Sequence, residues 1–440
     1  MTSVANSPGL AATLSRLEDG FRAANPTSAK LHARACSIMP GGNTRAVLYY
    51  DPFPLTFVRG EGATVTDADG HTYSDYVGEY AAGLFGHSDP RLRAAINAAL
   101  DDGVMLGGLN RHEAGFAEII RDRFPVMERI RFTNSGTEAN LFAIITARMA
   151  TGRNDILVFD GGYHGGCLTY VGGMRPHDVP FTTHVARYND IESVRALLEA
   201  RGDAIACVVI ELMMGAGGGI TADPGFLSAL RDETAARGIV LIFDEVVTSR
   251  MSGGGMQARL NVRPDMTTIG KYFGGGLGFG AFGGALDLMQ VWDLTRGGIA
   301  HGGTFNNNTL SMAAGTVAIR DIFTPATAEA LFERGEALAA RLRALGSAHG
   351  VPLSVLGAGS VMTLHLQHRL IRYPSDLCTP PGLRKLLHLA LLELGQSIGR
   401  RGYVTLSLPQ SAQDDDRLVS VLDDVLGTHA AAILEGLEGT

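Results

Sequence analysis

Short apolar runs alternate with helical segments through the middle of the chain. Runs at 156–159, 205–210 and 239–243 are each about four to six residues long and are followed by turn or acidic residues. Runs of this length, separated by helical segments, are typical of buried parallel strands in an α/β sheet. The pattern therefore predicts an α/β unit that begins near residue 90.

The regions on either side predict other elements. The N-terminal part predicts two short helices, at 10–24 and 28–38, followed by a β-hairpin at 63–76 around Ala68-Asp69-Gly70. After Thr324-Pro325, periodicity predicts a helix, two strands, a second helix, a third strand and a final helix. The expected ranges of the first five are 326–345, 353–356, 361–366, 382–395 and 403–408. We therefore expect a smaller α+β domain packed on the first.

Composition and charge narrow the function classes. The 440 residues are 45% hydrophobic and 19% charged, and the net charge is −8 with scattered positive residues. This balance argues against a nucleic-acid partner or an anionic membrane surface. No apolar run approaches the roughly 20 residues that span a bilayer, and no signal peptide is indicated. The four cysteines lie far apart without metal-ligand spacing, so we expect reduced thiols, no metal site and a cytoplasmic protein.

The first chemical motif lies at 133–140, just before a helical stretch. Ser135 and Glu138 fit a capping box, so a well-capped helix would explain the segment. The segment would also cradle a phosphate: Gly136 lets the backbone approach closely, and the hydroxyls of Ser135 and Thr137 with the helix dipole favour an anion. Taken alone, the motif favours the cap, because capping boxes are common.

The second motif, Gly161-Gly162-Tyr163-His164-Gly165-Gly166, follows the apolar run at 156–159. Loops at the carboxyl ends of parallel strands are where such folds bind ligands. Tyr163 would stack on a flat aromatic cofactor or would only anchor the loop. The loop alone does not separate these two interpretations.

The third and fourth motifs each place one charged residue beside apolar sequence. Asp244 ends an apolar run, where an acid is costly to bury unless it meets a cation or hydrogen-bond donors. It would hold a protonated pyridine nitrogen, cap a helix or bind a metal, although no His/Cys cluster accompanies it. Lysines are usually solvated, but Lys271 stands between an apolar run and a glycine turn. The interval between the two residues fits a helix-sized connection and a second strand.

Together the four motifs supply what pyridoxal phosphate needs: an anion cradle, a stacking ring, a carboxylate for the ring nitrogen and an amine for the aldehyde. The ordered set NSGTEAN, GGYHGG, FDEV and GKYFGGG resembles the class III aminotransferases of pyridoxal-phosphate fold type I. The resemblance runs from Met39 through Pro409. It implies an α/β fold, with a large domain built on a mostly parallel seven-stranded sheet between helices and a smaller α+β domain. The expected boundaries are 1–60 for an N-terminal segment joining the small domain, 61–324 for the cofactor domain and 325–440 for the small domain.

The resemblance also assigns roles to residues. It implies that Lys271 carries pyridoxal 5'-phosphate as a Schiff base and that Asp244 keeps the ring nitrogen protonated. It implies a homodimer in which Thr304, within Gly303-Thr304-Phe305, reaches the phosphate of the neighbouring subunit. The expected cofactor-binding residues are Ser135, Gly136, Thr137, Tyr163, His164, Glu211, Asp244, Val246, Lys271 and Thr304.

Within the class, the segments NTRAVL, DPFPL, TFNNN and RGY resemble the β-amino-acid aminotransferases of the aromatic β-phenylalanine type. This likeness implies that Arg45 holds the carboxylate of a β-amino acid. It implies that Arg401 holds that of the keto-acid acceptor, 2-oxoglutarate or pyruvate. The planar fork of arginine suits this task because it binds carboxylates bidentately. The residues alone would equally allow a loop salt bridge for Arg45 and a solvated pair for Arg401.

One segment departs from the class pattern. Relatives carry Glu-Pro after the run at 205–210, whereas this chain has Glu211-Leu212-Met213-Met214-Gly215. Met214 stands where the nearest relatives have a polar residue, and we expect it in the substrate-binding site. The departure leaves the cofactor expected and the substrate side chain open.

Three functions fit these observations. The first is an aminotransferase for β-amino acids, especially aryl-substituted ones. The second is an aminomutase like glutamate-1-semialdehyde 2,1-aminomutase, which moves the amino group within one substrate, or a broader ω-amino-acid or amine aminotransferase. The third is a non-catalytic ligand-binding protein that kept the fold, which the intact cofactor set disfavours.

Overall fold

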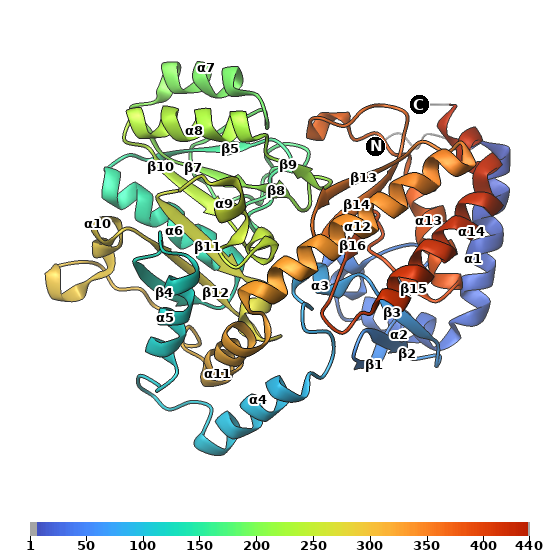
Figure 1. The fold of residues 1–440 in the computed structure, drawn as a ribbon, viewed down its shortest axis with the longest axis horizontal. Helices are drawn as coiled ribbons and strands as arrows, with labels where there is room; N and C mark the ends of the chain where they lie inside the picture. Colours follow the sequence, from blue (N-terminus) through green and yellow to red (C-terminus); the bar gives the residue numbers. More distant parts are fainter. Residues whose placement is uncertain (1–6, 439–440) are drawn as a thin grey trace.

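A seven-stranded sheet forms the centre of the computed structural model, which describes residues 7–438 (Figure 1). The strand order is β4-β12-β11-β10-β7-β5-β6. Strand β12 is antiparallel to both of its neighbours and the other pairs are parallel, which confirms the predicted fold class. The strands are β4 (Arg129–Thr133), β5 (Asp155–Phe159), β6 (Thr183–Ala186), β7 (Ile205–Glu211), β10 (Val240–Asp244), β11 (Met266–Gly270) and β12 (Gly280–Gly284).

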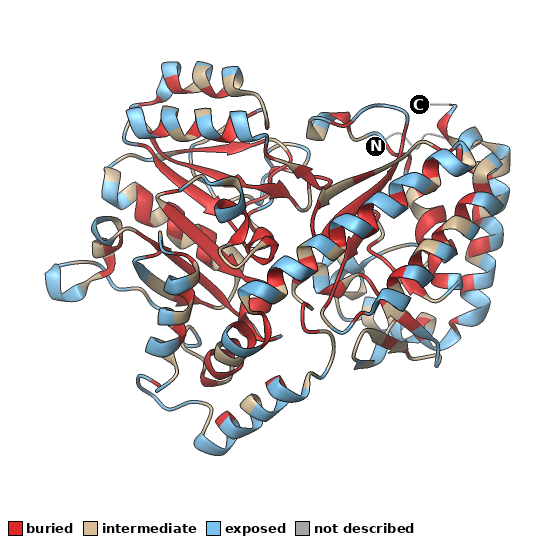
Figure 2. Ribbon diagram, in the orientation of Figure 1, coloured by how far each residue is buried: buried red, intermediate tan, exposed pale blue. Residues whose placement is uncertain are grey.

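Helices cover both faces of this sheet, and the central strands are therefore buried throughout (Figure 2). Alternate residues of β7 enter opposite apolar clusters, because successive side chains of a strand point to opposite faces. Val208 and Ile210 pack in the cluster that contains α7 (Ile191–Arg201) and α8 (Pro224–Ala236). Cys207 and Val209 pack in the cluster of α6 (Gly136–Thr151). These near-continuous apolar runs explain why β5, β7 and β10 were predictable from sequence.

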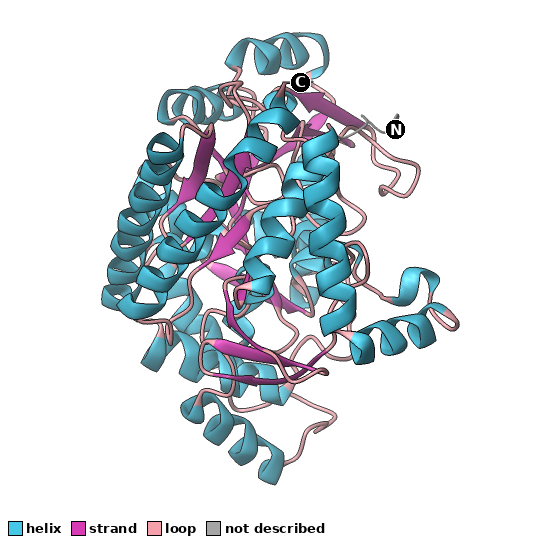
Figure 3. Ribbon diagram, turned by 90° about the vertical axis from the view of Figure 1, so that its right-hand side faces the viewer, coloured by secondary structure: helices cyan, strands magenta, loops and turns pink. Residues whose placement is uncertain are grey.

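Two smaller sheets lie beside the large one, as Figure 1 labels them, and helices pack around them on the side that faces the viewer in Figure 3. One is antiparallel, in the order β13-β14-β16. The other has the order β1-β2-β3-β15, so a strand from near the C-terminus extends the N-terminal hairpin. Helix α1 packs on α13 and α14 and so joins both ends of the chain. The strands are β1 (Phe57–Glu61), β2 (Thr64–Asp67), β3 (Thr72–Asp75), β13 (Leu353–Ala358), β14 (Val361–Leu366), β15 (Gln396–Ser397) and β16 (Tyr403–Thr405).

The remaining elements are mostly helices. They are α1 (Pro8–Ala24), α2 (Pro26–Cys36), α3 (Gly78–Ala81), α4 (Pro90–Asp102), α5 (Glu113–Arg123), α9 (Gly255–Leu260), α10 (Leu286–Met289), α11 (Thr309–Val317), α12 (Pro325–His349), α13 (Pro381–Glu393) and α14 (Ala412–Leu437). A short hairpin joins β8 (Met213–Met214) and β9 (Ile220–Thr221). Within residues 7–438, none of the helices combines the length and apolar character needed to cross a bilayer.

The predicted helices and the hairpin at 63–76 are confirmed to within a few residues. The strand predicted at 403–408 is too long, because the Leu408 N–H bonds to the Leu84 carbonyl instead of continuing the pairing with β14. The domain boundaries at 60 and 324 stay predictions, as does the cytoplasmic location. The expected absence of a targeting signal rests partly on residues 1–6, which lie outside the described residues.

Candidate active site

The carboxylate of Asp244 is buried and hydrogen-bonded at the carboxyl ends of the parallel strands. It ends β10, is 3% exposed, and its Oδ2 accepts a hydrogen bond from Asn140 Nδ2 at 2.8 Å. His164 Nδ1 lies 2.8 Å from the same oxygen, and Oδ1 accepts from the Val246 N–H at 3.0 Å. A buried carboxylate keeps its charge only with such donors. The site is therefore built to hold a negative charge away from water.

Asn140 connects this carboxylate to two other elements. It also donates to the His164 carbonyl at 3.0 Å, and its Oδ1 accepts from the Thr268 hydroxyl on β11 at 2.6 Å. Burial disfavours the charged form of His164, but the hydrogen bond and charge of Asp244 outweigh it and raise the pKa of His164. The ring is therefore favoured as a donor to Asp244.

Glu211 is a second buried carboxylate beside the first. It pairs in register with Asp244 across β7 and β10. Its oxygens accept from the Tyr163 N–H at 2.8 Å and the Gly215 N–H at 3.0 Å, which hold the glycine-rich loop and the start of the β8–β9 hairpin. Burial raises the pKa of Glu211 to about 7. Glu211 thus contacts the backbone of the loop that carries Tyr163.

Lys271 directly follows β11 and has a left-handed backbone, with φ +56°. Burial lowers its pKa to about 8, and the charges of Arg250 and Arg45 act in the same direction. Asp244 and Glu211 oppose this shift. Its Nζ donates to the Tyr80 carbonyl at 2.5 Å. The amine therefore reaches neutrality far more readily than that of an exposed lysine.

The Tyr80 carbonyl belongs to a turn whose backbone is left-handed. Four consecutive residues, Gly78, Glu79, Tyr80 and Ala81, have positive φ angles between 48° and 77°. This conformation costs about 1–2 kcal/mol for each residue other than glycine. Asp75 Oδ1 supports the turn by accepting from the N–H groups of residues 77 and 78. Strain of this kind persists where the surroundings impose it, commonly at functional sites.

The predicted phosphate cradle lies at the N-terminus of the 16-residue helix α6. Ser135 Oγ accepts from the Glu138 N–H at 3.2 Å, which confirms Ser135 as the N-cap, whereas the Glu138 carboxylate accepts from the Asn134 N–H and does not complete a capping box. A Cβ on Gly136 would lie 2.9 Å from the methyl groups of Val246, and one on Gly165 would lie 2.4 Å from Thr137 Oγ1. The glycines therefore bring the cap, Val246 and the His164 loop into close contact. The helix N-terminus suits an anion as well as a cap.

Three further predicted residues, Arg45, Arg401 and Tyr163, are exposed. Arg45 forms an ion pair with Glu79 of the left-handed turn. Arg401 is exposed, yet it acts electrostatically on Tyr80 together with Arg45 and Arg400. Tyr163 is 45% exposed, so its ring is open to a ligand.

Two other predicted residues are Met214, which is buried, and Thr304, which is exposed. Met214 is 1% exposed, and its sulfur lies 3.4 Å from where a Cβ on Gly161 would stand, so it backs the glycine loop. Thr304 lies in an exposed turn. Direct contact of Met214 with substrate and the reach of Thr304 into a neighbouring subunit stay predictions.

Sequence reasoning did not single out four residues of this site: Glu79, Tyr80, Asn140 and Thr268. Asn140 and Thr268 lie inside motifs that were recognised, four residues after Gly136 and three before Lys271. Helical spacing in α6 was a usable signal for Asn140, because positions four apart share a face. Glu79 and Tyr80 had no such signal, since their turn contains ordinary residues in a conformation that glycine normally adopts.

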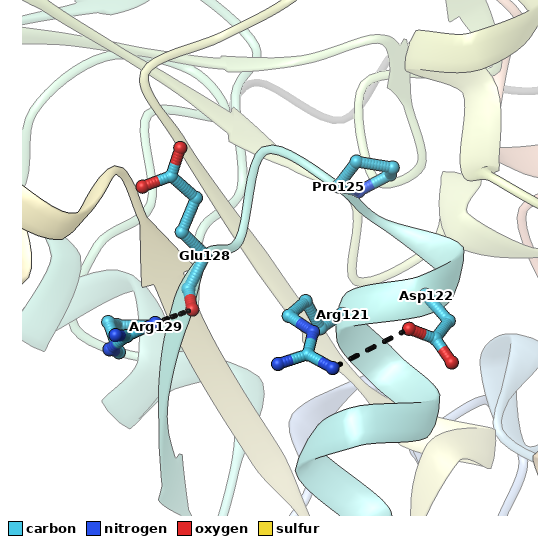
Figure 4. A pocket seen from close by; sticks show the side chains of 5 residues that line it. All are labelled: Arg121, Asp122, Pro125, Glu128 and Arg129. Carbon is cyan, nitrogen blue, oxygen red and sulfur yellow. Dashed lines mark hydrogen bonds and ion pairs between the residues drawn. The ribbon is translucent and has the colours of Figure 1, made fainter.

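Two surface hollows lie elsewhere. One of ≈ 640 Å³ is lined by Arg121, Asp122, Pro125, Glu128 and Arg129 at the end of α5 and the start of β4 (Figure 4). Its charged groups already have partners, since Arg121 lies 3.9 Å from Asp122 and Arg129 Nη1 donates to the Glu128 carbonyl. The other, of ≈ 380 Å³, lies between β9 and β13. Over residues 7–438, no cluster of three His, Cys, Asp or Glu suits a metal ion.

Comparison with known proteins gives a consistent match. Residues 48–379 match the model of the class-III aminotransferases. The chain is 46% identical over 434 residues to the beta-phenylalanine transaminase of Variovorax paradoxus, covering 98% of this chain and 99% of that protein. A crystal structure of a beta-phenylalanine aminotransferase from that organism superposes with TM-score 0.94 over 96% of this chain and 98% of the other. Glutamate-1-semialdehyde 2,1-aminomutase of Desulfosudis oleivorans is 37% identical, covering 90% of this chain and 98% of that protein.

The hydrogen bonds of Asn140 predict a stability change. Asn140→Ala removes its bonds to Asp244, His164 and Thr268 and leaves a buried carboxylate with fewer donors. We expect the free energy of unfolding to fall by about 2–4 kcal/mol, measured by urea denaturation. Asn154→Ala is the matched control, because Asn154 accepts only an exposed bond from Arg148. Equal, small effects of the two substitutions would contradict the account.

Proposed function

This chain belongs to the class-III aminotransferase family, and on that premise we propose that it transfers the amino group of β-amino acids to 2-oxoglutarate or pyruvate. The chain is an aminotransferase and its cofactor is pyridoxal phosphate. The proposed donors are aryl-substituted, as in β-phenylalanine, on which the relative from Variovorax paradoxus acts by its name. The observation that carries the proposal is the ion pair of Arg45 with Glu79, because Glu79 belongs to the turn whose Tyr80 carbonyl accepts from Lys271 and a guanidinium suits a carboxylate.

The donor groups of the site fit the cofactor. The N-terminus of α6, with Ser135, Gly136 and Thr137, would hold the phosphate. Asp244 would pair with the ring nitrogen, since its charge is already supported by Asn140 and Val246. When bound, pyridoxal phosphate supplies an aldehyde for amines and a ring that takes up the electron pair released at the substrate carbon.

Lys271 would hold the cofactor aldehyde and then move the proton. A proton leaving the substrate carbon needs a neutral amine as its acceptor, and the pKa of about 8 provides a useful neutral fraction near neutral pH. The Tyr80 carbonyl keeps Nζ oriented by accepting its hydrogen bond. His164 and Asn140 keep Asp244 in place throughout. The chain therefore positions both the base and the counter-charge.

Donor and acceptor would occupy the same site in turn. Arg45 would bind the carboxylate of the β-amino acid and Arg401 that of the keto acid, each through the bidentate fork of a guanidinium. The charges of both guanidinium groups lower the pKa of Tyr80, which supports placing both near the turn that contains Tyr80. The buried Met214 and Leu212 shape the wall behind the loop of Tyr163 and would influence the choice of side chain.

An apolar surface supports the proposed homodimer. The segments 104–109 and 305–309 adjoin, because Asn307 donates to the Gly108 carbonyl and Thr309 to the Val104 carbonyl. Leu109 is 88% exposed and Phe305 is 54% exposed. Exposed apolar patches of this kind mark interaction surfaces. We propose that a second copy of the chain covers the patch formed by Leu109 and Phe305. Thr304 would then reach the phosphate of the cofactor bound in that copy.

A screen of single donors tests the substrate proposal. The holoenzyme is mixed with β-phenylalanine, β-alanine, α-amino acids or arylalkylamines while the cofactor spectrum is followed. We expect β-phenylalanine to react fastest. Arg45→Gln should weaken β-amino-acid binding about 10- to 100-fold, the value of a charged hydrogen bond, and leave the amines unchanged. Conversion only by α-amino acids would rule out the proposed donor class.

The pKa of Lys271 predicts how the cofactor-free protein captures pyridoxal phosphate. Raising the pH deprotonates the amine, and only the neutral amine attacks an aldehyde. The capture rate should rise with pH, reach half its maximum near the Lys271 pKa of about 8, and then level off. Stopped-flow absorbance measures this rate, and Nα-acetyl-lysine corrects for the ionisations of pyridoxal phosphate itself. A rate that still climbs steeply at pH 10 would show an unperturbed lysine.

A further inference from the structure

The carboxylate of Glu79 forms an ion pair with the guanidinium of Arg45, which the proposed function assigns to the substrate carboxylate. Arg45 Nη1 donates to Glu79 Oε2, and the two side chains are 43% and 57% exposed. The backbone of Glu79 lies in the left-handed turn, at φ +48°. The next residue of that turn contacts Lys271. The backbone of Glu79 therefore adjoins the residue that contacts Lys271, while its exposed side chain pairs with Arg45.

The charges around this pair are unbalanced. Among the charged groups with the largest effects on the pKa of the neighbouring Tyr80 hydroxyl are the guanidinium groups of Arg400, Arg45 and Arg401, which lower it, and the carboxylate of Glu79, which raises it. The Tyr80 hydroxyl donates to the Val47 carbonyl at 3.2 Å and so ties the turn to the segment that carries Arg45. Glu79 and Arg45 are therefore carried by two segments that contact each other, and the Glu79 carboxylate offsets part of the positive charge of the arginines.

We propose that Glu79 is an exchangeable counter-ion that determines specificity by occupying Arg45 until a substrate carboxylate displaces it. This inference rests on the proposed function. While the acceptor keto acid is bound at Arg401, Glu79 satisfies Arg45. When a β-amino acid enters, its carboxylate takes the place of Glu79, which turns to solvent.

The exposure of the pair makes this exchange feasible. Exposed ion pairs contribute only about 0.2–1 kcal/mol, whereas removing one partner of a buried pair leaves a costly unpaired charge. A half-exposed pair therefore holds Arg45 without blocking it. Competition by Glu79 weakens the binding of every ligand that uses Arg45, and it leaves ligands without a carboxylate unaffected.

Calorimetric binding of 3-phenylpropionate to the holoenzyme tests the exchange, because this acid has no amino group and does not react. Glu79→Gln removes the competing charge and should tighten binding about two- to fivefold, the equivalent of an exposed pair. Glu79→Gly removes the same charge and suits the positive φ, so it serves as a second variant and should give the same result. Binding of 3-phenylpropanol, which lacks the carboxylate, should stay unchanged in both.

Glu61→Gln is the matched control, since Glu61 pairs with Arg59 on β1 in another exposed arginine–glutamate pair. It should bind 3-phenylpropionate like the unaltered enzyme. Weaker or unchanged binding in both Glu79 variants would overturn the proposal, because Glu79 would then orient Arg45 or play no part. Arg45→Gln separates this failure from that of the proposed function. If it leaves 3-phenylpropionate binding intact, the carboxylate site at Arg45 is itself wrong.

Discussion

The structure depends above all on keeping one carboxylate charged inside the protein. Asp244 is buried where β10 ends, and isolated burial of such a charge is prohibitive. Its hydrogen bonds draw α6, the loop after β5 and the turn after β10 toward one point through Asn140, His164 and Val246. Because β7 and β11 pair in register with β10, Glu211 and Thr268 end beside it. The parallel sheet thus serves as the frame for an electrostatic site.

The charged groups of the site become more exposed with each step away from the buried Asp244. Lys271 is partly buried and its pKa is lowered, whereas Arg45 and Arg401 are exposed. Buried groups hold fixed positions because moving them exposes unpaired charge, and exposed pairs exchange partners easily. This gradient suits a site that keeps its cofactor while two different acids come and go. The left-handed turn joins the two zones, since one of its residues contacts Lys271 and another contacts Arg45.

Sequence reasoning reached the fold and named Asp244, Lys271 and the two arginines, but it missed the turn that contains Glu79 and Tyr80. The buried strands were predictable because their apolar runs are short and end in turn or acidic residues, as at Asp244. Lys271 stood out because its flanks are apolar or glycine. The turn at Glu79 and Tyr80 was not predictable, because its conformation is imposed by Asp75 and by packing rather than by local residue preference. The end of β16 was misplaced because tertiary hydrogen bonding to Leu84 outweighs the apolar pattern of residues 406–408.

Transfer of labelled nitrogen between two molecules tests the central claim most directly. The enzyme is incubated with ¹⁵N-labelled β-phenylalanine and unlabelled 2-oxoglutarate, and the products are separated and analysed by mass spectrometry. The account predicts that the label appears in glutamate and that the donor skeleton is released as the keto acid. Retention of the label in the phenylpropanoid skeleton, with or without movement to another carbon, would contradict it.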